Sequence, residues 1–282
     1  ISGVVGGFFY QNSGAKVVPF FAVLIPLLCC LAGSLLASLI YCFLTVTLKA
    51  NQNVTGLALT TFGVGLGNFF GGSLIKIVKS DVPYLSLVKI AKAFKTTLPF
   101  AEDLGPVGQL LFSYGFLVYL AVIIAVAVSL FLKKTRAGLQ LRAVGENPAT
   151  ADAAGINVSR NKYLATCVGA GISGLGGLYY TMDYIKGTWA SEGTIEALGW
   201  LAVALVIFAV WRSLNAIWGA YLFGFLTWLY LYIPGLSRSS QELFKMLPYL
   251  ATILVLVVVS LRKKRENQPP AHLGLSYFRE ER

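Results

Sequence analysis

The sequence predicts an all-α fold: a polytopic bundle of transmembrane helices, some of them broken or re-entrant. Of its 282 residues, 56% are hydrophobic and only 12% are charged, whereas roughly a quarter of the residues in soluble domains are charged. The mean hydropathy is +0.71. Six apolar runs contain no charged residue: 17–48, 53–75, 111–132, 164–180, 214–233 and 247–261. We therefore expect one membrane domain over residues 1–265 and a tail over residues 266–282.

The first of these runs, residues 17–48, is longer than a straight membrane-spanning helix needs to be. A helix rises about 1.5 Å per residue, and the hydrocarbon core of a bilayer is roughly 30 Å thick. We expect this run to tilt, to kink or to begin above the membrane, with Pro19 and Pro26 near its start.

The run 53–75 contains three glycines at a spacing of four residues, Gly63, Gly67 and Gly71. This spacing places them on one helix face, where they predict close packing of a neighbouring helix. The alternative is that they loosen the helix without a packing partner.

Residues 76–107 are polar and carry five lysines. Five apolar residues fall on one face at helical spacing, namely Tyr84, Leu87, Val88, Ala91 and Phe94. This pattern predicts an amphipathic helix on the membrane surface or over the mouth of a cavity. A solvated loop is the alternative.

The runs 111–132 and 164–180 predict two further spans. Within the second, residues 169–174 read Gly-Ala-Gly-Ile-Ser-Gly, which matches the dinucleotide-binding pattern. That pattern binds phosphate only between a strand and a helix N-terminus, and no strand precedes it here. We interpret these glycines as helix-packing residues.

The short run 199–211 is too short to cross the membrane and is followed directly by the longer run 214–233. This order predicts a broken or re-entrant hairpin, which is tolerated at membrane depth only where protein or a cavity satisfies the backbone. The run 247–261 is the last predicted span, and we expect the tail after it to have little fixed structure.

A polar stretch over residues 133–163 interrupts the apolar sequence and contains a short helix with both ends specified. Asn147 is a preferred N-cap, Pro148 suits the first helical position, alanines follow, and Gly155 suits the position after the last turn. We predict a helix from Pro148 to Ala154. An ordinary loop with one helical turn is the alternative.

This stretch resembles the cytoplasmic loop of permease subunits of ATP-binding-cassette (ABC) importers for simple sugars and nucleosides. In that family a G-x-N-P-x-A-A-x-x-x-G-I-x-V pattern forms the coupling helix, which seats in the ATPase. The resemblance implies a coupling helix that includes Glu146, Asn147, Pro148, Ala151, Asp152, Ala154 and Gly155. Asp152 stands where the family often carries a bulkier or basic residue, which changes the charge of the docking face.

Three further segments resemble the same family: residues 54–59 (VTGLAL), residues 199–204 (GWLAVA), and Leu247-Pro248-Tyr249 with Thr252. The resemblance reaches to about residue 261. It implies a permease that translocates nucleosides, or simple sugars, without a cofactor. It also implies three kinds of partner: a second permease that is a copy or a distinct homologue, ABC ATPase subunits, and an external substrate-binding lipoprotein.

The basic residues predict the orientation in a cell membrane. Most of them lie at Lys49, in 133–162, at Arg212 and from Arg262 onward. Cytoplasmic flanks carry an excess of Lys and Arg, so we expect a multi-pass protein whose loop 133–163 and C-terminus are cytoplasmic. The same distribution accounts for the net charge of +11 without nucleic-acid binding.

The sequence offers little for catalysis. Its single histidine, His272, lies in the tail, the four cysteines all lie in apolar runs, and no metal-ligand spacing or G-x-x-x-x-G-K-[ST] loop occurs. We therefore expect a non-catalytic subunit without metal or cofactor, and any ATP hydrolysis must occur in a partner. The alternative function is a secondary transporter or channel for a small neutral solute.

A neutral substrate needs polar groups along its path. The candidates are Asn51, Asn53, Thr55, Thr60 and Asn68. Each of them alternatively caps a helix or bonds its own backbone. Family members often carry Asn where Thr60 stands.

Overall fold

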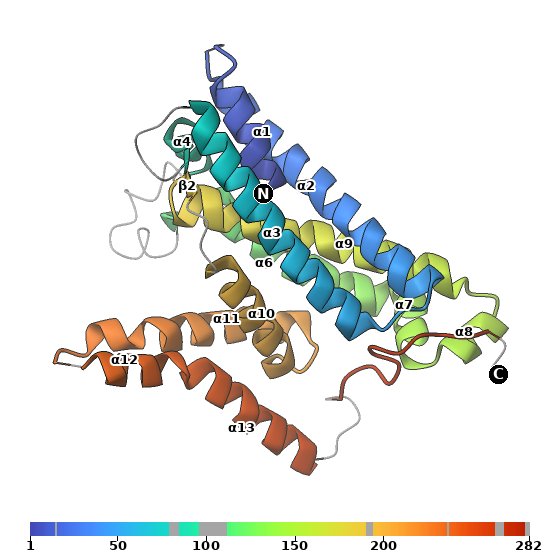
Figure 1. Ribbon diagram of the computed structural model, residues 1–282. Helices are drawn as coiled ribbons and strands as arrows, with labels where there is room; N and C mark the ends of the chain where they lie inside the picture. Colours follow the sequence, from blue (N-terminus) through green and yellow to red (C-terminus); the bar gives the residue numbers. More distant parts are fainter. Residues whose placement is uncertain are drawn as a thin grey trace. The chain divides into compact units, whose positions relative to one another are not determined.

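The computed structural model describes residues 1–14, 16–78, 85–95, 112–189, 194–235, 237–262 and 268–279 (Figure 1). Its strands in this part of the chain are two residues long, so the predicted all-α fold is confirmed. Within these residues, five helical segments are long and apolar enough to cross a membrane: Pro19–Thr47, Gln52–Leu74, Phe116–Lys134, Ser213–Tyr232 and Ser239–Leu261. The protein is a polytopic helical membrane protein.

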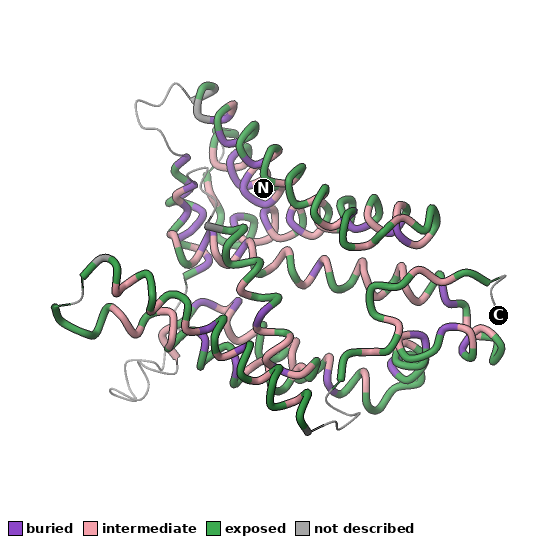
Figure 2. Tube along the Cα trace, turned by 60° about the horizontal axis from the view of Figure 1, so that its bottom comes forward, coloured by how far each residue is buried: buried purple, intermediate pink, exposed green. Residues whose placement is uncertain are grey.

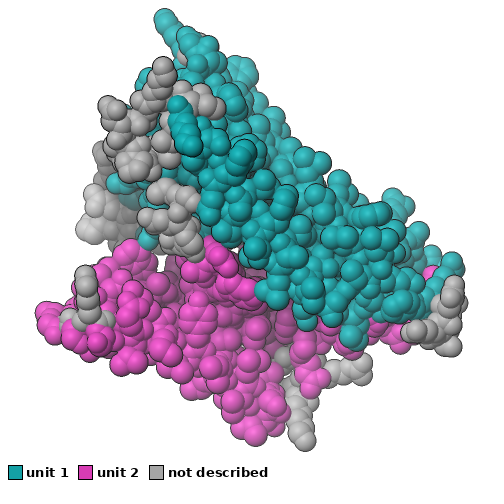
Figure 3. Space-filling view, viewed as in Figure 1, with its two compact units in different colours: residues 1–121, 155–195, 274–282 teal, residues 122–154, 196–273 magenta. Residues whose placement is uncertain are grey.

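The chain forms two compact units (Figure 3). The first comprises residues 1–121, 155–195 and 274–282. It contains α1 (Ser2–Gln11), α2 (Pro19–Cys42), the π-helical turn η1 (Phe43–Thr47), α3 (Gln52–Val78), β1 (Leu85–Ser86), α4 (Val88–Phe94), α9 (Val158–Tyr179), the π-helical turn η2 (Tyr180–Tyr184) and β2 (Thr188–Trp189).

The second unit comprises residues 122–154 and 196–273. It contains most of α6 (Phe116–Lys134), α7 (Arg136–Glu146), α8 (Pro148–Ala153), most of α10 (Thr194–Phe208), α11 (Ser213–Trp228), the 3-10 turn η3 (Leu229–Tyr232), α12 (Arg238–Lys245) and α13 (Leu247–Arg262).

Close helix packing in the first unit depends on glycines of α1 and α9. Helix α2 packs against both of these helices (Figure 1). A Cβ atom on Gly3 of α1 would lie 2.9 Å from the carbonyl oxygen of Pro26, and one on Gly174 of α9 would lie 3.1 Å from the Cβ of Ser34. The Cys30 thiol donates to the Gly174 carbonyl (3.1 Å). Of the glycines of 169–174, Gly174 therefore serves close helix packing, as predicted, whereas a Cβ atom on Gly169 would meet no atom within 4 Å.

The glycines of α3 lie in different surroundings. A Cβ atom on Gly67 would lie 3.5 Å from Ile1 Cδ1, whereas one on Gly63 would meet no atom within 4 Å. Gly71 is buried. Packing of one helix against all three glycines stays a prediction.

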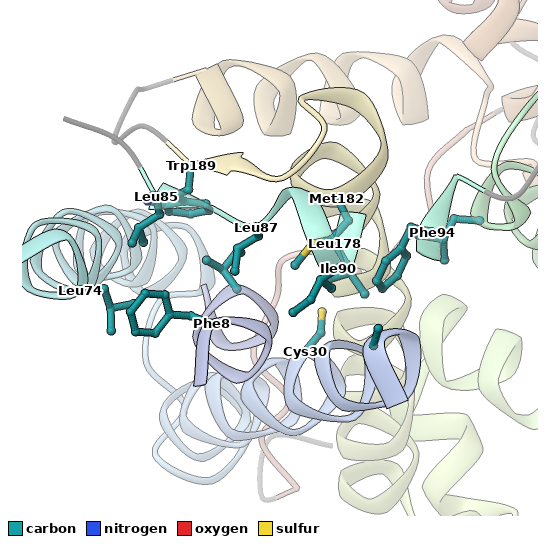
Figure 4. Close-up of a cluster of buried hydrophobic side chains, with 13 residues drawn as sticks. Phe8, Cys30, Leu74, Leu85, Leu87, Ile90, Phe94, Leu178, Met182 and Trp189 are labelled. Atoms are coloured by element: carbon teal, nitrogen blue, oxygen red, sulfur yellow. The ribbon is translucent and has the colours of Figure 1, made fainter. Parts of the chain in front are cut away.

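The main hydrophobic cluster of the first unit forms where α4 covers α1, α2 and η2 (Figure 4). Leu87, Ala91 and Phe94 are buried there, as the predicted amphipathic face requires. Val88 is exposed, because the buried face runs through Leu87, Ile90, Ala91 and Phe94 at helical spacing and Val88 lies beside it. Tyr84 lies outside the described residues.

A helical hairpin of α10 and α11 confirms the predicted short helix, turn and longer helix. Its turn holds Val210 and Trp211 at φ +54° and +58°, although neither is glycine. Below the turn, the rings of Phe208 and Phe223 lie 5.2 Å apart. The Asn215 side chain donates to the Ala209 carbonyl (3.2 Å), which holds the turn from within.

Two features differ from the prediction. The polar helix α12 was not expected, although Ser237 caps it by accepting from the Ser240 amide. The tail segment 268–279, expected to have little fixed structure, contains a turn in which the Leu273 amide donates to the Pro270 carbonyl (3.0 Å). Gly274 follows this turn at φ +75°.

Much of the helical surface is exposed or half-buried (Figure 2). Large apolar side chains lie on it, among them Trp218, Leu254 and Leu261. Lipid tails are as apolar as these groups, so spanning helices need no protein partner there.

We expect Gly3→Ala to destabilise the packing of α1 on α2. The added methyl group would press on the Pro26 carbonyl, a backbone atom that cannot rotate away, at a cost of about 1–3 kcal/mol. Gly65→Ala is the matched control, because Gly65 also lies in a helix but has no atom within 4 Å of the place that a Cβ would take. Thermal unfolding of the purified chain in detergent measures the effect, and equal melting temperatures for the two variants would contradict the packing argument.

Candidate functional site

The candidate site begins where α6 turns into α7 at a single residue, Thr135. Its hydroxyl group donates to the Phe131 carbonyl (2.7 Å) and accepts from the Gly138 amide (3.0 Å). A Cβ atom on Gly138 would lie 2.8 Å from Leu132 Cα. The α6–α7 connection is therefore tight, and only glycine fits at position 138.

Helix α8 follows α7 and has both predicted ends. The Asn147 side chain accepts from the Thr150 amide (3.0 Å), and Pro148 occupies the first turn. The Ala154 amide donates to the Thr150 carbonyl (3.1 Å) at the other end. Gly155 then adopts φ +81°, the left-handed conformation that glycine favours. The predicted helix 148–154 is observed, with Ala154 as its C-cap.

The two faces of α8 differ in exposure. Pro148 and Ala151 are buried, and Ala151 is only 3% exposed, because α8 packs against α7. Glu146, Asn147, Thr150, Ala153 and Ala154 are exposed, and Asp152 is half-buried. Within the predicted coupling-helix set, Ala151 belongs to the face packed on the chain itself, and Ala154 to the face open to a partner.

The loop ends at Asn157, a second capping asparagine that the sequence interpretation did not single out. Its side chain accepts from the Arg160 amide (2.9 Å) at the start of α9. The Thr47 and Tyr163 hydroxyl groups lie 2.5 Å apart, so the second turn of α9 is hydrogen-bonded to η1. Asn followed by a helical segment was the signal available for this cap.

The candidate substrate residues bond mainly to their own backbone. Asn51 accepts from the Asn53 and Val54 amides (2.9 and 3.2 Å), which caps the start of α3. The Thr55 and Thr60 hydroxyl groups donate to carbonyls four residues earlier. The side chains of Asn53, Thr60 and Asn68 are exposed. The structure brings Asn51, Asn53 and Thr55 together and leaves Thr60 and Asn68 further along the helix.

Groups for metal or redox chemistry are sparse in the described part of the chain. No three His, Cys, Asp or Glu side chains lie there in a metal-binding group. Cys29, Cys30, Cys42 and Cys167 are free thiols. The site is a short capped helix with one exposed face, on a polar loop of a membrane protein.

These features define the class of the protein: a multi-pass helical membrane protein that carries a capped helix on the polar loop between two of its long helices. The chain belongs to the family described as branched-chain amino acid transport system / permease component, whose model matches residues 1–256.

Several relatives cover most of the chain. It is 32% identical to the putative glucose ABC transporter permease protein TsgC13 of Haloferax volcanii, over 86% of this chain and 77% of that protein. It is 30% identical to the nucleoside ABC transporter permease protein NupC of Lactococcus lactis, over 90% and 80%. It is 31% identical to the guanosine ABC transporter permease protein NupQ of Bacillus subtilis, over 88% and 75%. No solved structure matches the chain.

We expect Gly155→Val to loosen the C-terminal end of α8. No atom lies within 4 Å of the added Cβ position, so the cost is that of a β-branched residue in a left-handed conformation, about 1–2 kcal/mol. Hydrogen exchange of the Ala154 amide should accelerate roughly tenfold. The control is Gly155→Asn, because asparagine tolerates this conformation, and equal exchange in both variants would contradict the assignment.

Proposed function

We propose that this chain is the membrane-spanning permease subunit of an ABC importer and translocates nucleosides, or simple sugars, delivered by an external binding protein. The observation that carries the proposal is α8. So short a helix does not persist alone in water, yet here it is capped, buried on α7 along one side and exposed at Thr150, Ala153 and Ala154. In an importer, this exposed face seats in a groove of the ATPase.

Nucleosides are the preferred cargo. Two relatives that cover most of the chain are named for nucleoside or guanosine transport and one for glucose. On α3, the exposed side chains of Asn53, Thr60 and Asn68 are the polar groups available to a neutral substrate. Asn51 and Thr55 contribute to the start of the same helix.

The importer requires partners that this chain does not supply. The sequence contains no phosphate-binding loop for ATP, so the ATP is hydrolysed by cassette-type ATPase subunits and this chain is a non-catalytic subunit. A second permease, either a copy or a distinct homologue, completes the pathway. An external lipoprotein delivers the substrate.

The exposed face of α8 and the C-terminus lie on the cytoplasmic side. Within the second unit the His272 amide donates to the Gly145 carbonyl (3.0 Å), directly before α8. The tail and the loop therefore share one side of the membrane. The basic residues that follow α6 and α13 favour the cytoplasm for both.

A secondary transporter or channel is less well supported. Ion-coupled carriers place charged residues within the membrane, whereas the six apolar runs of this chain contain none. The named relatives are ABC transporter permeases. Both observations favour the importer.

The decisive variant is Ala154→Trp, which enlarges the exposed face of α8. We expect the variant to insert normally but to lose both ATPase stimulation and uptake, because the indole blocks seating of the helix. Uptake of labelled nucleoside, with labelled glucose for comparison, is measured in vesicles containing the complete importer.

Two further variants serve as controls. Ala154→Ser keeps the face small and should retain full activity. Ala151→Trp should instead lower thermal stability, because Ala151 is buried against the chain itself. Full uptake by the Ala154→Trp importer would mean that α8 is an ordinary loop turn, and the coupling assignment would have to be withdrawn.

A further inference from the structure

Residues 275–278 of the tail belong to the first unit and lie across the ends of three of its helical elements, η1, α3 and α9. The Leu275 carbonyl accepts from Gln52 Nε2 at the start of α3 (3.3 Å) and from Lys162 Nζ in the second turn of α9 (3.5 Å). One carbonyl group of the tail therefore connects α3 to α9. These two helix ends cannot move apart unless at least one of the two hydrogen bonds breaks.

The connection between η1 and α3 is held by the same part of the tail. The Lys49 carbonyl accepts from the Ser276 hydroxyl (3.3 Å), and the Lys49 ammonium lies 4.3 Å from the centre of the Phe278 ring, within the range of a cation–π interaction. Lys49 adopts φ +57° although it is not glycine. Such a conformation persists only while the surroundings enforce it, and the tail supplies part of those surroundings.

The Lys162 amine gives the tail a further attachment. This amine is half-buried, and burial lowers its pKa. A partly desolvated ammonium group needs hydrogen-bond acceptors in place of the water that it has lost. The Leu275 carbonyl is such an acceptor, so the start of α9 is better satisfied while the tail is in place.

The tail contacts the end of α3 that carries polar groups proposed for the substrate. Gln52 lies between Asn51 and Asn53, and Thr55 follows in the first turn of the helix. The segment Gln52–Leu74 is long and apolar enough to cross a membrane, so its start lies at a membrane boundary. In the proposed importer this boundary is the cytoplasmic one, where the substrate leaves.

The contacts of residues 275–278 are individually weak. Their three hydrogen bonds, at 3.3, 3.3 and 3.5 Å, are exposed and longer than usual. Leu275 is 54% exposed and Phe278 is 40% exposed, so the segment buries little apolar surface. An attachment of this kind orders the tail and can still break when the helix ends separate.

We propose that residues 275–278 form a releasable strap, which restrains the cytoplasmic ends of α3 and α9 and keeps the exit of the substrate path closed between transport cycles. This inference rests on the proposed function. Contacts that exist in only one of two conformations shift the equilibrium toward that conformation. The strap therefore stabilises the closed state, suppresses ATP hydrolysis without substrate, and leaves Lys49 and Gln52 when the exit opens.

The first test removes the strap's side-chain contacts in the complete importer, reconstituted in vesicles. In Ser276→Ala/Phe278→Ala the hydroxyl donor and the aromatic ring are absent. We expect ATP hydrolysis without substrate to rise about two- to fivefold, the factor that corresponds to an exposed cation–π contact. Ser276→Thr/Phe278→Tyr is the matched control, because it keeps a hydroxyl group and a ring, and it should behave like the unmodified importer.

The second test prevents release. Gln52→Cys/Leu275→Cys is prepared in a chain whose four native cysteines are replaced by alanine, and the pair is joined with a flexible, cleavable bismaleimide. We expect uptake to fall at least tenfold after joining and to return when the reagent is cleaved. Each single-cysteine variant, treated with the same reagent, should keep its uptake.

Three results would overturn the proposal. The first is unchanged ATP hydrolysis in Ser276→Ala/Phe278→Ala. The second is a lower melting temperature with loss of both hydrolysis and uptake in that variant, since the tail would then only support the fold. The third is full uptake by the joined Gln52→Cys/Leu275→Cys importer.

Uptake by the unmodified importer separates this proposal from the proposed function. If vesicles with every partner subunit take up labelled nucleoside or glucose and the strap variants behave like their controls, only the strap fails. If the unmodified importer takes up neither, the proposed function fails, and the strap fails with it.

Discussion

Helix ends outside the lipid carry backbone amides and carbonyls without intrahelical partners, and the loop of this protein depends on pairing them. The side chains of Thr135, Asn147 and Asn157 cap three successive helices, and each accepts from the amide three residues further on. The His272 amide pairs with the Gly145 carbonyl at the opposite end of α7. A loop held in this way keeps a defined shape with few buried side chains, and one face of α8 stays exposed.

Structure that is determined locally could be predicted from the sequence, and α8 is the best example. Asn147 and Gly155 specify its two ends through their own conformations, without reference to the rest of the fold. The burial of Ala151 could not be predicted, because it depends on how α8 packs on α7. The start of α9 at Val158 was missed for a different reason: hydropathy places a span only where charges are absent, whereas the helix also includes Arg160.

The glycines also show that packing between helices cannot be predicted from local sequence. Spacing identified Gly63 as a packing residue, yet close helix contacts involve Gly3 and Gly174, on the two helices that flank α2. Spacing tells which glycines share a face, and only the fold tells which face meets a neighbour. For the candidate site, the existence and the two ends of α8 could be predicted from the sequence. Which face of α8 is exposed, and where the tail lies, could not.

The turn between α10 and α11 has a mechanical consequence. Val210 and Trp211 both occupy the left-handed region, which costs non-glycine residues of the order of 1–2 kcal/mol each. Such conformations persist only while the surroundings enforce them. Free energy stored in this turn is released when the turn relaxes. The released free energy offsets part of the cost of changing the angle between the two helices. The turn is thus a strained connection within the second unit, whereas α1 and α9 of the first unit meet α2 through close glycine contacts.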